Sequence, residues 1–410
     1  MRTCGDHMLS EQWPVVDDCL VCGGMALTLV AARVGRTPFY AYDRRLLSER
    51  VDLLRTHLPR DIKLHYAIKA NPMPALVGHM ARIVDGLDVA SGGELSIALD
   101  TGTDRRDISF AGPGKTESEL AQALASGILI NVESLREIDV LARLSLETGK
   151  AARVAVRVNP DFELKSSGMK MGGGPKQFGI DAEIVPEALK RIDLLGLPFE
   201  GFHIFSGSQN LKPEAICEAQ RKTLALAIRL AAFAPSPVRV LNIGGGFGIP
   251  YFPGDKALDL ERIGENLQGL VVDAQTTLPQ AKLVIELGRF LVGEAGIYVC
   301  RVIDRKVSRG HVFLVTDGGL HHHLAASGNF GQVIRKNYPV VIGNKIRGSQ
   351  REIASVVGPL CTPLDILANS VDLAEARPGD LVVVFQSGAY GATASPQAFL
   401  SHPAAVEVLV

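Results

Sequence analysis

Eight short apolar runs recur along the first 290 residues of this chain, and their spacing constrains its fold more than any other feature. They begin near Leu64, Gly86, Asp107, Ile128, Arg153, Glu200, Arg239 and Leu283. The first five begin about 20 to 25 residues apart and the later ones about 40 to 50, which leaves room for a crossover helix after each strand. Their hydrophobicity is continuous rather than alternating, as in strands buried on both faces.

Eight strand–helix units are the number found in a closed (β/α)8 barrel, and we predict this α/β barrel for residues 45–290. Helical patterns fill gaps between the runs, for example over residues 117–125 and 216–232. An open doubly wound sheet could use the same elements. It would usually carry a GxGxxG motif in its first strand–turn–helix unit, and none is present there.

The pattern changes after about residue 290. Short apolar runs over residues 312–315, 351–357 and 380–385 are separated by Gly, Pro, Asn and Asp. This alternation predicts a separate all-β domain over residues 291–410. We expect residues 25–44 to join this β domain.

Composition excludes several classes of protein. Hydrophobic residues make up 47% of the 410 residues, as in a globular protein with a sizeable core. The 43 Lys and Arg residues are balanced by 44 Asp and Glu residues, and this balance argues against a nucleic-acid partner. No apolar run approaches the roughly 20 residues of a membrane span. Six scattered cysteines predict a reducing, cytoplasmic environment. The CxxC pair at Cys19 and Cys22 lacks a second pair for zinc, so we interpret both as structural thiols.

Lys69 follows the first apolar run, within the HYAIKANP segment of residues 65–72. A lysine at the end of a buried strand is costly unless it reaches an opening or forms a bond. Burial also lowers the pKa of an ammonium and so releases the free amine that Schiff-base chemistry needs. Lys69 is therefore a candidate covalent anchor for an aldehyde cofactor, and a lysine extending back to water is the plainer alternative.

Polar residues also end other predicted strands, where barrel enzymes gather their catalytic groups. The fifth strand carries Arg157 and the sixth presents His203. The eighth ends at Glu286, followed by Arg289. The seventh runs into three glycines at residues 244–246, whose backbone amides can close around phosphate oxygens. Taken singly, each group has a structural alternative: a core histidine, a flexible loop or a buried Glu–Arg pair.

Together these groups match what pyridoxal 5'-phosphate needs: an amine, an imidazole that stacks on its ring, a phosphate cradle and a carboxylate. The carboxylate matters most for the reaction type. Held beside the pyridine nitrogen, it keeps that nitrogen protonated, so that the ring can accept electrons.

Over nearly its whole length the chain resembles the fold type III pyridoxal-phosphate-dependent decarboxylases, the family of ornithine, arginine and diaminopimelate decarboxylases. The motifs that carry the resemblance are YAIKAN at 66–71, DVAS at 88–91 with Glu94, His203 with Ser206, GGG at 244–246, ELGR at 286–289, GPLC at 358–361 and GAY at 388–390. The resemblance implies an alanine racemase-like barrel with a C-terminal β domain. It also implies decarboxylation of an amino acid to the amine and carbon dioxide.

The resemblance implies roles for single residues as well. Lys69 would bind the cofactor covalently, His203 would stack on its ring, and Glu286 would face the pyridine nitrogen. Asp88 and Arg157 would support the cofactor from behind these contacts. Family members are homodimers with active sites at the subunit interface.

Phosphate binding would use residues from several motifs. The cofactor-binding residues would further include Ser206, Gly244, Gly245, Gly246, Gly288, Arg289 and Tyr390. The family's Gly-Ser pair aligns equally well with Gly207 and Ser208, which leaves two candidate serines. Cys361 would reach the partner subunit's site and return a proton after carbon dioxide leaves.

One departure from the family bears on the substrate. Diamine-forming members carry an acidic residue after the cysteine, which binds the distal amine of the substrate, and this chain has Thr362 there. A neutral hydroxyl cannot neutralise an ammonium, so ornithine, lysine and diaminopimelate are disfavoured.

A second departure is the DGGLHHH sequence of residues 317–323, where diaminopimelate decarboxylases have an Arg-Pro-containing stretch. Consecutive strand residues point to opposite faces and cannot all bind one metal, so we interpret the three histidines as pocket lining rather than a zinc site. This sequence, with CTPLD at 361–365, is similar to a subgroup associated with exopolysaccharide export and carrier-protein-linked biosynthesis. An acyl- or aminoacyl-conjugated substrate is implied, such as a glutamyl thioester. The candidate substrate contacts are Thr362, Asp365, His321, His322 and His323.

Rival interpretations are a diaminopimelate or ornithine-type decarboxylase, an amino-acid racemase on the same scaffold, and a non-catalytic regulator. Racemisation would need a second base facing Lys69 and a weaker electron sink, so Glu286 opposes it. The intact Lys69, Glu286 and Cys361 oppose a regulator. We therefore predict a dimeric pyridoxal-phosphate decarboxylase whose substrate is an amino acid, free or linked to a carrier protein.

Overall fold

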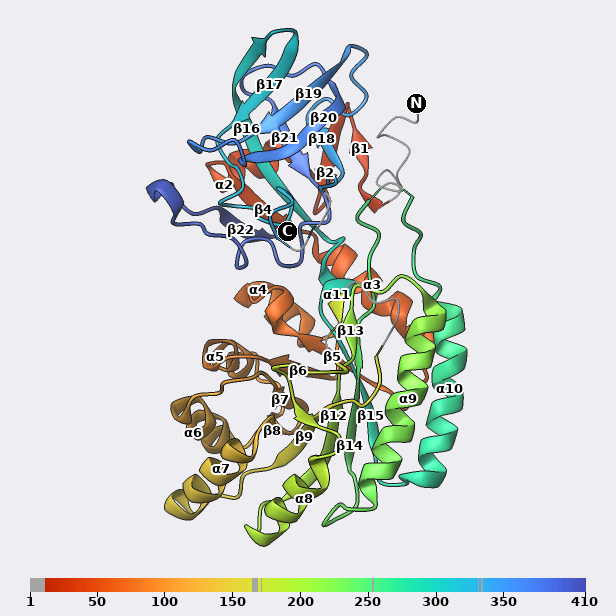
Figure 1. Ribbon diagram of the computed structural model, residues 1–410. Helices are drawn as coiled ribbons and strands as arrows, with labels where there is room; N and C mark the ends of the chain where they lie inside the picture. The colour runs from red at the N-terminus through yellow and green to blue at the C-terminus, as the bar shows by residue number, and fades with distance from the viewer. Residues whose placement is uncertain (1–11, 164–168, 171, 253, 331, 333–334) are drawn as a thin grey trace. The chain divides into compact units, whose positions relative to one another are not determined.

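The computed structural model describes residues 12–163, 169–170, 172–252, 254–330, 332 and 335–410. These residues fall into two compact units (Figure 1). The barrel unit comprises Arg50–Ile249 and Ala257–Phe290. The β unit comprises Leu291–Val410, Pro250–Lys256 and the described part of Met1–Glu49. The domain boundaries set out from the sequence stay a prediction.

In the barrel unit, eight of the described strands close into a parallel barrel. Their bounds are Lys63–Ala67 (β5), Gly86–Val89 (β6), Ile108–Phe110 (β7), Leu129–Val132 (β8), Val154–Asn159 (β9), Phe199–Ile204 (β12), Val240–Gly245 (β14) and Lys282–Leu287 (β15). Consecutive barrel strands pair in parallel, and β15 pairs with β5 to close the ring. Each strand begins within one residue of a predicted run, and the closure excludes the open-sheet alternative.

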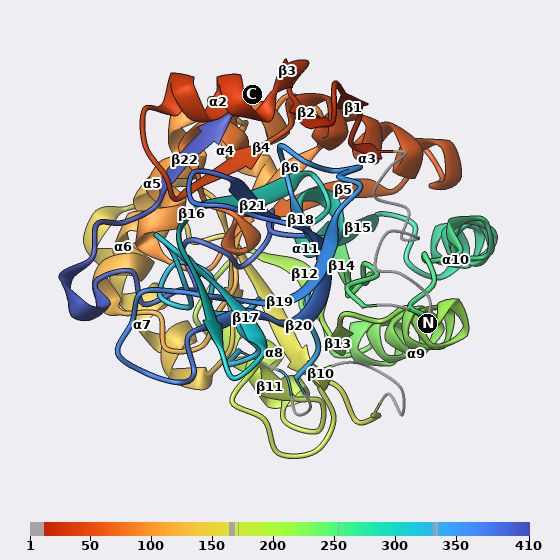
Figure 2. The ribbon, with the colours of Figure 1, turned by 90° about the horizontal axis from the view of Figure 1, so that it is seen from above.

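Helices precede and follow the barrel strands (Figures 1 and 2). Their bounds are Arg44–His57 (α3), Pro74–Met80 (α4), Gly92–Asp100 (α5), Glu117–Ser126 (α6), Leu135–Thr148 (α7), Val185–Leu194 (α8), Pro213–Ala231 (α9), Leu260–Thr277 (α10) and Arg289–Val292 (α11). Sequence fixes α6 at both ends: Thr116 and Glu119 form a capping box, and Gly127 ends the helix with a left-handed φ of 71°. The predicted helices over 117–125 and 216–232 correspond to α6 and α9.

Short strands follow β9 and β12 at the carboxyl ends of the barrel, where catalytic loops of this fold lie. Met169–Lys170 (β10) pairs antiparallel with Gly207–Ser208 (β13). Ile180–Asp181 (β11) adds to the edge of β9 in parallel. The chain after β12, which holds both candidate serines, is thus fixed by backbone pairing.

The β unit is built on a sheet of order β18-β21-β16-β17-β19-β20. Its strands are Gly296–Ser308 (β16), His311–Thr316 (β17), Val340–Ile342 (β18), Arg351–Val357 (β19), Ile366–Ala374 (β20) and Leu381–Val384 (β21). The three predicted runs correspond to β17, β19 and β21.

Both ends of the chain contribute to this unit. Phe39–Tyr42 (β4) pairs antiparallel with β16, and Val406–Leu409 (β22) pairs in parallel with β4. A small antiparallel sheet of Val15–Val16 (β1), Cys19–Cys22 (β2) and Met25–Ala26 (β3) precedes Leu27–Val34 (α2). Within the described parts of the chain, no helix is long and apolar enough to cross a membrane.

Candidate active site

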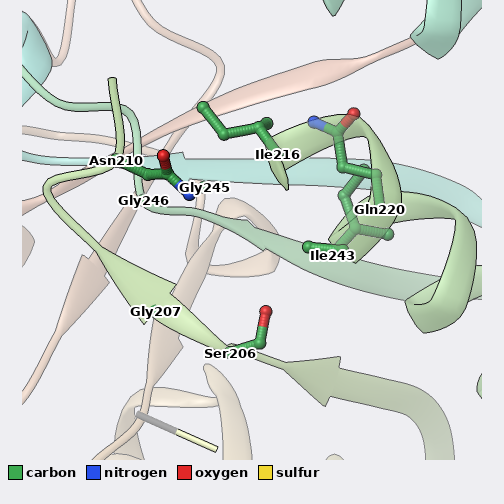
Figure 3. Close-up of a pocket in the computed structure, with 9 residues that line it drawn as sticks. Ser206, Gly207, Asn210, Ile216, Gln220, Ile243, Gly245 and Gly246 are labelled. Atoms are coloured by element: carbon green, nitrogen blue, oxygen red, sulfur yellow. The ribbon is translucent and has the colours of Figure 1, made fainter. Parts of the chain in front are cut away.

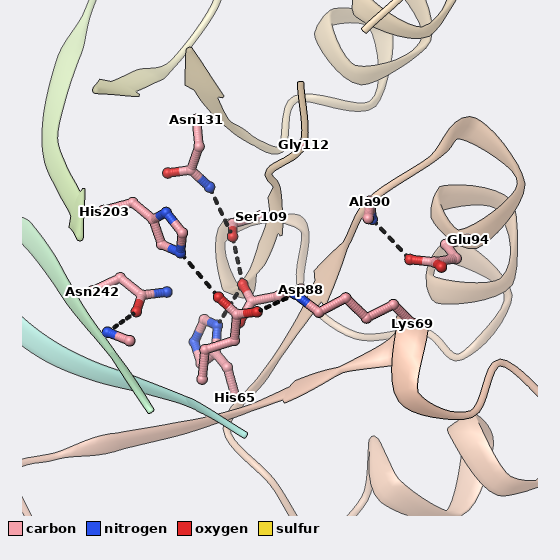
Figure 4. Close-up of polar contacts among 12 residues, drawn as sticks. His65, Lys69, Asp88, Ala90, Glu94, Ser109, Gly112, Asn131, His203 and Asn242 are labelled. Carbon is pink, nitrogen blue, oxygen red and sulfur yellow. Dashed lines mark hydrogen bonds and ion pairs between the residues drawn. The ribbon is translucent and has the colours of Figure 1, made fainter. Parts of the chain in front are cut away.

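Each barrel strand carries at least one buried polar side chain among apolar neighbours, and we call a set of eight, one from each strand, the polar belt. Its members are His65, Asp88, Ser109, Asn131, Arg157, His203, Asn242 and Glu286. Backbone register sets Glu286 opposite His65, and sets His203 opposite both Arg157 and Asn242. Figure 4 shows how the labelled members gather in one region. Because burying polar groups is costly, a ring of them marks a site.

Lys69 lies in the 3₁₀ turn Ile68–Ala70 (η2), directly after β5 rather than in the strand. Its Nζ is 3.2 Å from Glu286 Oε1 and 5.7 Å from the centroid of the Phe205 ring. The side chain is 45% exposed, so the expectation of a lysine desolvated by burial is wrong. The turn carries the amine out of the strand, and Glu286 balances its charge.

Glu286 connects Lys69 to His203. The His203 Nε2 atom lies 2.9 Å from Glu286 Oε2, and both side chains are buried. Burial raises the pKa of Glu286, but the Lys69 ammonium and the His203 hydrogen bond outweigh it, and the pKa lies below its usual value. An ionised carboxylate only accepts, so His203 donates from Nε2. Among the described residues, the buried His203 Nδ1 has no hydrogen-bond partner.

Asp88 is held by a second chain of contacts (Figure 4). Its Oδ1 accepts from Ser109 Oγ at 2.5 Å and lies 3.2 Å from His65 Nδ1. Asn131 Nδ2 in turn donates to Ser109 Oγ at 3.2 Å. Burial lowers the pKa of His65, but the carboxylates around it, Asp88 foremost, together outweigh burial, and the pKa lies above its usual value.

Arg157 is positioned by carboxylates that sequence reasoning missed. Its NH1 donates to Glu133 Oε1 at 2.8 Å, and Glu133 also accepts from the backbone of Gly112 and Gly179. A second buried pair joins Lys115 Nζ to Glu137 Oε2 at 3.0 Å. Burial raises the pKa of Glu133, but the two cations outweigh it, and the pKa lies below its usual value.

Glycines shape a small cavity at the end of β14 (Figure 3). Gly244 and Gly246 have φ of 71° and 77°, a region that favours glycine. A Cβ atom on Gly245 would lie 2.1 Å from the Glu286 carbonyl oxygen, so larger residues are excluded. Ser206 lines this cavity together with Gly245 and Gly246. Within the described chain, the nearby Ser208 Oγ is buried without a partner.

The residues after β15 are also closely packed. A Cβ atom on Gly288 would lie 2.9 Å from the Ala70 Cβ atom, so this glycine permits η2 and β15 to approach. Arg289 begins α11. Tyr390, in the β unit, adopts a left-handed backbone conformation with φ of 54°.

The loop between β19 and β20 carries Cys361 and Thr362. Cys361 is exposed and free. Asp365 is buried, with Oδ1 accepting from the Leu320 N–H at 2.6 Å and Oδ2 from the Leu360 N–H at 2.8 Å. Both carboxylate oxygens are therefore engaged: Oδ2 bonds within this loop, and Oδ1 bonds the residue that precedes the three histidines at 321–323. Burial raises the pKa of Asp365 despite these two bonds.

The histidine segment, residues 321–323, forms a turn after β17, so its expected placement on a strand is wrong. His323 accepts from Ala326 N–H at Nδ1 and contacts Ser387 Oγ at 2.9 Å from Nε2. His322 donates from Nε2 to the Pro403 carbonyl at 2.8 Å. Both are thus held by the protein itself.

His321 differs, because neither of its ring nitrogens has a hydrogen-bond partner in the described chain. Burial lowers the pKa of both His321 and His323 to about 3, so both are neutral at pH 7. The described residues contain no group of three or more His, Cys, Asp or Glu side chains that could hold a metal ion.

The site defines a class of protein. A parallel (β/α)8 barrel carries, at its strand ends, an amine paired with a buried carboxylate, an imidazole bonded to that carboxylate and a glycine-lined anion cradle. These are the parts of an enzyme that binds a phosphorylated aldehyde cofactor.

Comparison with known proteins gives the family. The family model described as "Pyridoxal-dependent decarboxylase, pyridoxal binding domain" matches residues 44–293, and this chain belongs to that family. The L-glutamyl-[BtrI acyl-carrier protein] decarboxylase of Niallia circulans is 40% identical over 379 residues, which cover 91% of this chain and 88% of the relative. The diaminopimelate decarboxylase of Aquifex aeolicus is 34% identical over 413 residues, covering 98% and 94%.

A solved structure supports the same assignment. The crystal structure of AQ1208 from Aquifex aeolicus matches with a TM-score of 0.85 and 31% identity, covering 98% of this chain and 93% of that one. The chain is thus a pyridoxal-phosphate-dependent carboxy-lyase with an alanine racemase-like barrel. The predicted family, fold, enzyme class and cofactor are confirmed.

The residues present fit this cofactor. The Lys69 amine suits its aldehyde, and the anionic Glu286 suits a protonated ring nitrogen. The cradle excludes any Cβ atom at Gly245, and the unpartnered hydroxyl of Ser208 suits a phosphate oxygen.

Sequence reasoning missed half of the polar belt and the carboxylates behind Arg157. The missed residues are His65, Ser109, Asn131, Asn242, Lys115, Glu133 and Glu137. A signal was present for the first four, since each is the polar residue in a short apolar run. The last three lie in loops or on a helix, where polar residues are ordinary, so only the structure identifies them.

Proposed function

We propose that this chain releases carbon dioxide from an amino acid whose far end is joined to a carrier or another acyl group, with Lys69 as the covalent anchor of the cofactor. The contact of Lys69 and His203 with the two oxygens of Glu286 carries the catalytic part of this proposal. It brings an amine, a buried carboxylate and an imidazole from three strand ends to one point.

Bound pyridoxal phosphate supplies an electron-accepting ring that takes up the electron pair of the broken carbon–carbon bond. Glu286 would face the ring nitrogen and keep a proton there, because the His203 hydrogen bond and the nearby Arg157 charge both lower the Glu286 pKa. Lys69 would hold the cofactor aldehyde through Nζ, which lies 3.2 Å from Glu286 Oε1. His203 would fix the other oxygen and pack against the ring. A carboxylate at this position favours decarboxylation over racemisation.

Asp88 and Arg157 would support the cofactor from behind these contacts. Asp88 keeps one oxygen in the Ser109 and His65 contacts, and its other oxygen is buried with no partner in the described chain. Arg157 is fixed by Glu133 and lowers the pKa of Glu286.

The backbone amides of Gly244, Gly245 and Gly246 would hold the phosphate, together with Gly288, Arg289 and Tyr390. Ser206 lines the cavity beside these glycines, and Ser208 has the buried free hydroxyl. Both serines therefore remain candidates for a phosphate oxygen.

Cys361 would return a proton to the reacting carbon in the site of a second subunit. Its thiol is exposed and free, as a group that acts outside its own chain must be. This role of Cys361 requires a homodimer. The free thiols of the described chain support a reducing compartment, and we propose the cytoplasm.

The substrate proposal rests on three side chains of the Cys361 loop and the histidine segment, none of which offers a free charge to a substrate. Thr362 is neutral, Asp365 has both oxygens engaged by backbone N–H groups, and His321 is neutral at pH 7. Such groups suit a thioester or amide better than an ammonium, because a buried ammonium needs a charged partner. The first relative named above acts on a glutamyl group on a carrier protein.

Carbon dioxide release from matched substrates tests this proposal. The assay would compare five compounds at equal concentrations: glutamate on a carrier protein, glutamate on a short pantetheine thioester, free glutamate, ornithine and diaminopimelate. We expect the two thioesters to exceed the free amino acids at least about tenfold in kcat/KM. Faster turnover of ornithine or diaminopimelate would refute the substrate class. Failure of every compound, despite cofactor uptake, would refute the catalytic proposal.

A further inference from the structure

His65 is a titratable residue of the polar belt to which no role has been given so far. It lies on β5 between the apolar Leu64 and Tyr66, and it is buried. Its ring packs on the Gly86 backbone, where a Cβ atom would lie 2.5 Å from His65 Nε2. The neighbouring strand therefore makes room for this imidazole in particular.

The contacts of His65 lead toward the cofactor site. Its Nδ1 lies 3.2 Å from Asp88 Oδ1, and Ser109 Oγ donates to the same oxygen. Oδ1 is thereby fully engaged. Asp88 Oδ2 is buried, and no hydrogen-bond partner lies among the described residues. One side of the carboxylate is anchored, and the other is left for a group from outside the chain.

Charge explains why a histidine is suited to this position. A carboxylate buried with a hydroxyl alone would tend to take up a proton, whereas an adjacent imidazolium keeps it ionised. The acidic groups that face His65 are Asp88 on β6, Asp107 before β7 and Glu286 on β15, and all three favour the imidazolium. A histidine on β5 can therefore pair with the Asp88 carboxylate as a cation.

We propose that His65 is a positioning residue that acts on the cofactor through Asp88. It orients the Asp88 carboxylate and pairs with it at Oδ1, so that Oδ2 accepts a hydrogen bond from the bound pyridoxal phosphate. The inference rests on the proposed cofactor placement beside Asp88.

Two substitutions of His65 separate the effect of its charge from that of its shape, and two further variants serve as comparisons. H65F keeps a flat ring in the same space and removes both nitrogens, and H65Q keeps a donor without the charge. S109A removes the other hydrogen bond to Oδ1 and leaves the imidazolium. L64V shortens the neighbouring buried residue on the opposite face of β5, and serves as the control for lost packing alone.

The readouts are the Kd of pyridoxal phosphate for the apo protein and the absorbance of the bound cofactor, each from about pH 6 to about pH 8. In H65F we expect the Kd to rise about tenfold at the low end of this range, because a buried carboxylate that has lost its cationic partner takes up a proton more readily. We expect H65Q to show the same added pH transition in the cofactor spectrum, more weakly. S109A should weaken binding evenly across pH, and L64V should lower only the unfolding temperature of the apo protein.

The inference is overturned if H65F and H65Q bind and absorb as L64V does across the pH range. It is also overturned if S109A produces the same added transition, since charge would then not be the cause. Wild-type protein that takes up no pyridoxal phosphate would instead refute the proposed site. If H65F does not fold, H65Q alone decides the outcome.

Discussion

The polar belt and the histidine segment are both buried and polar, but they manage charge in opposite ways. In the polar belt, Glu286 is paired with Lys69 and Asp88 with His65, so anions persist inside the barrel. In the β unit, Asp365 is fixed by two backbone N–H groups, and burial keeps His321 neutral. Paired charge suits a reaction that moves electrons and protons, whereas a neutral segment suits an uncharged part of a substrate.

The largest effect is expected for K69A. Without its amine the chain cannot bind the cofactor covalently, so we expect at least about a 1000-fold loss of carbon dioxide release. Borohydride reduction followed by mass spectrometry should find no cofactor on the variant. K63A removes another lysine that is 45% exposed and should keep both properties. Cofactor trapped on a different lysine of active K69A would contradict the assignment.

The next largest effect is expected for E286Q. Glutamine has the same size but cannot keep a proton on the ring nitrogen, so kcat should fall about 100-fold. Borohydride should still trap the cofactor on Lys69, which distinguishes a chemical defect from lost binding. An unchanged kcat would mean that the carboxylate serves only to pair Lys69.

Removal of the Glu133 charge, which pairs with Arg157 of the polar belt, should lower the free energy of unfolding. Glu133 pairs with Arg157, and E133Q leaves that guanidinium buried and unpaired, which we expect to lower the free energy of unfolding by ~3 kcal/mol. The native pKa of Glu133 lies below its usual 4.5, so its stabilisation is present above that pH and is lost as the pH falls through the native pKa. Urea titrations at several pH values would measure both effects. E147Q, on an exposed pair, should change little.

The corresponding change in the β unit is expected to be smaller. D365N offers one acceptor oxygen to two backbone N–H groups, so we expect a loss of ~1.5 kcal/mol in unfolding free energy. The Kd of pyridoxal phosphate should not change. A weaker cofactor affinity in D365N would show that the two regions are not independent.

The smallest effect is expected for T362D, which restores an acidic residue after the cysteine. We expect kcat/KM for ornithine or diaminopimelate to rise about tenfold relative to a glutamyl thioester, because the new carboxylate can pair with an ammonium. T362N, which is neutral and of similar size, is the matched control. An equal gain in both variants would exclude charge as the cause.

Much of this architecture was predictable from local pattern. All eight apolar runs became barrel strands, because continuous hydrophobicity over so few residues suits a strand covered on both faces. The glycines at 244–246 were recognisable, since positive φ and close backbone contacts admit no other residue.

Other features depended on contacts across the chain. Lys69 was expected at the end of the strand with a desolvated amine, but a single 3₁₀ turn places it after the strand in an exposed position. The histidines were expected on a strand, but Asp365, more than 40 residues later, holds the preceding residues in a turn. No local pattern reveals a carboxylate that binds backbone from such a distance.

The sequence by itself determined the barrel, the family and the residue types at the strand ends, because strand periodicity and glycine geometry act over a few residues. Only the tertiary structure decided which polar groups form hydrogen bonds and ion pairs with one another. Lys69 and Glu286 are 217 residues apart in the chain, yet Nζ and Oε1 lie 3.2 Å apart. Electrostatic energy depends on distance in space, and the closing of β15 onto β5 sets that distance.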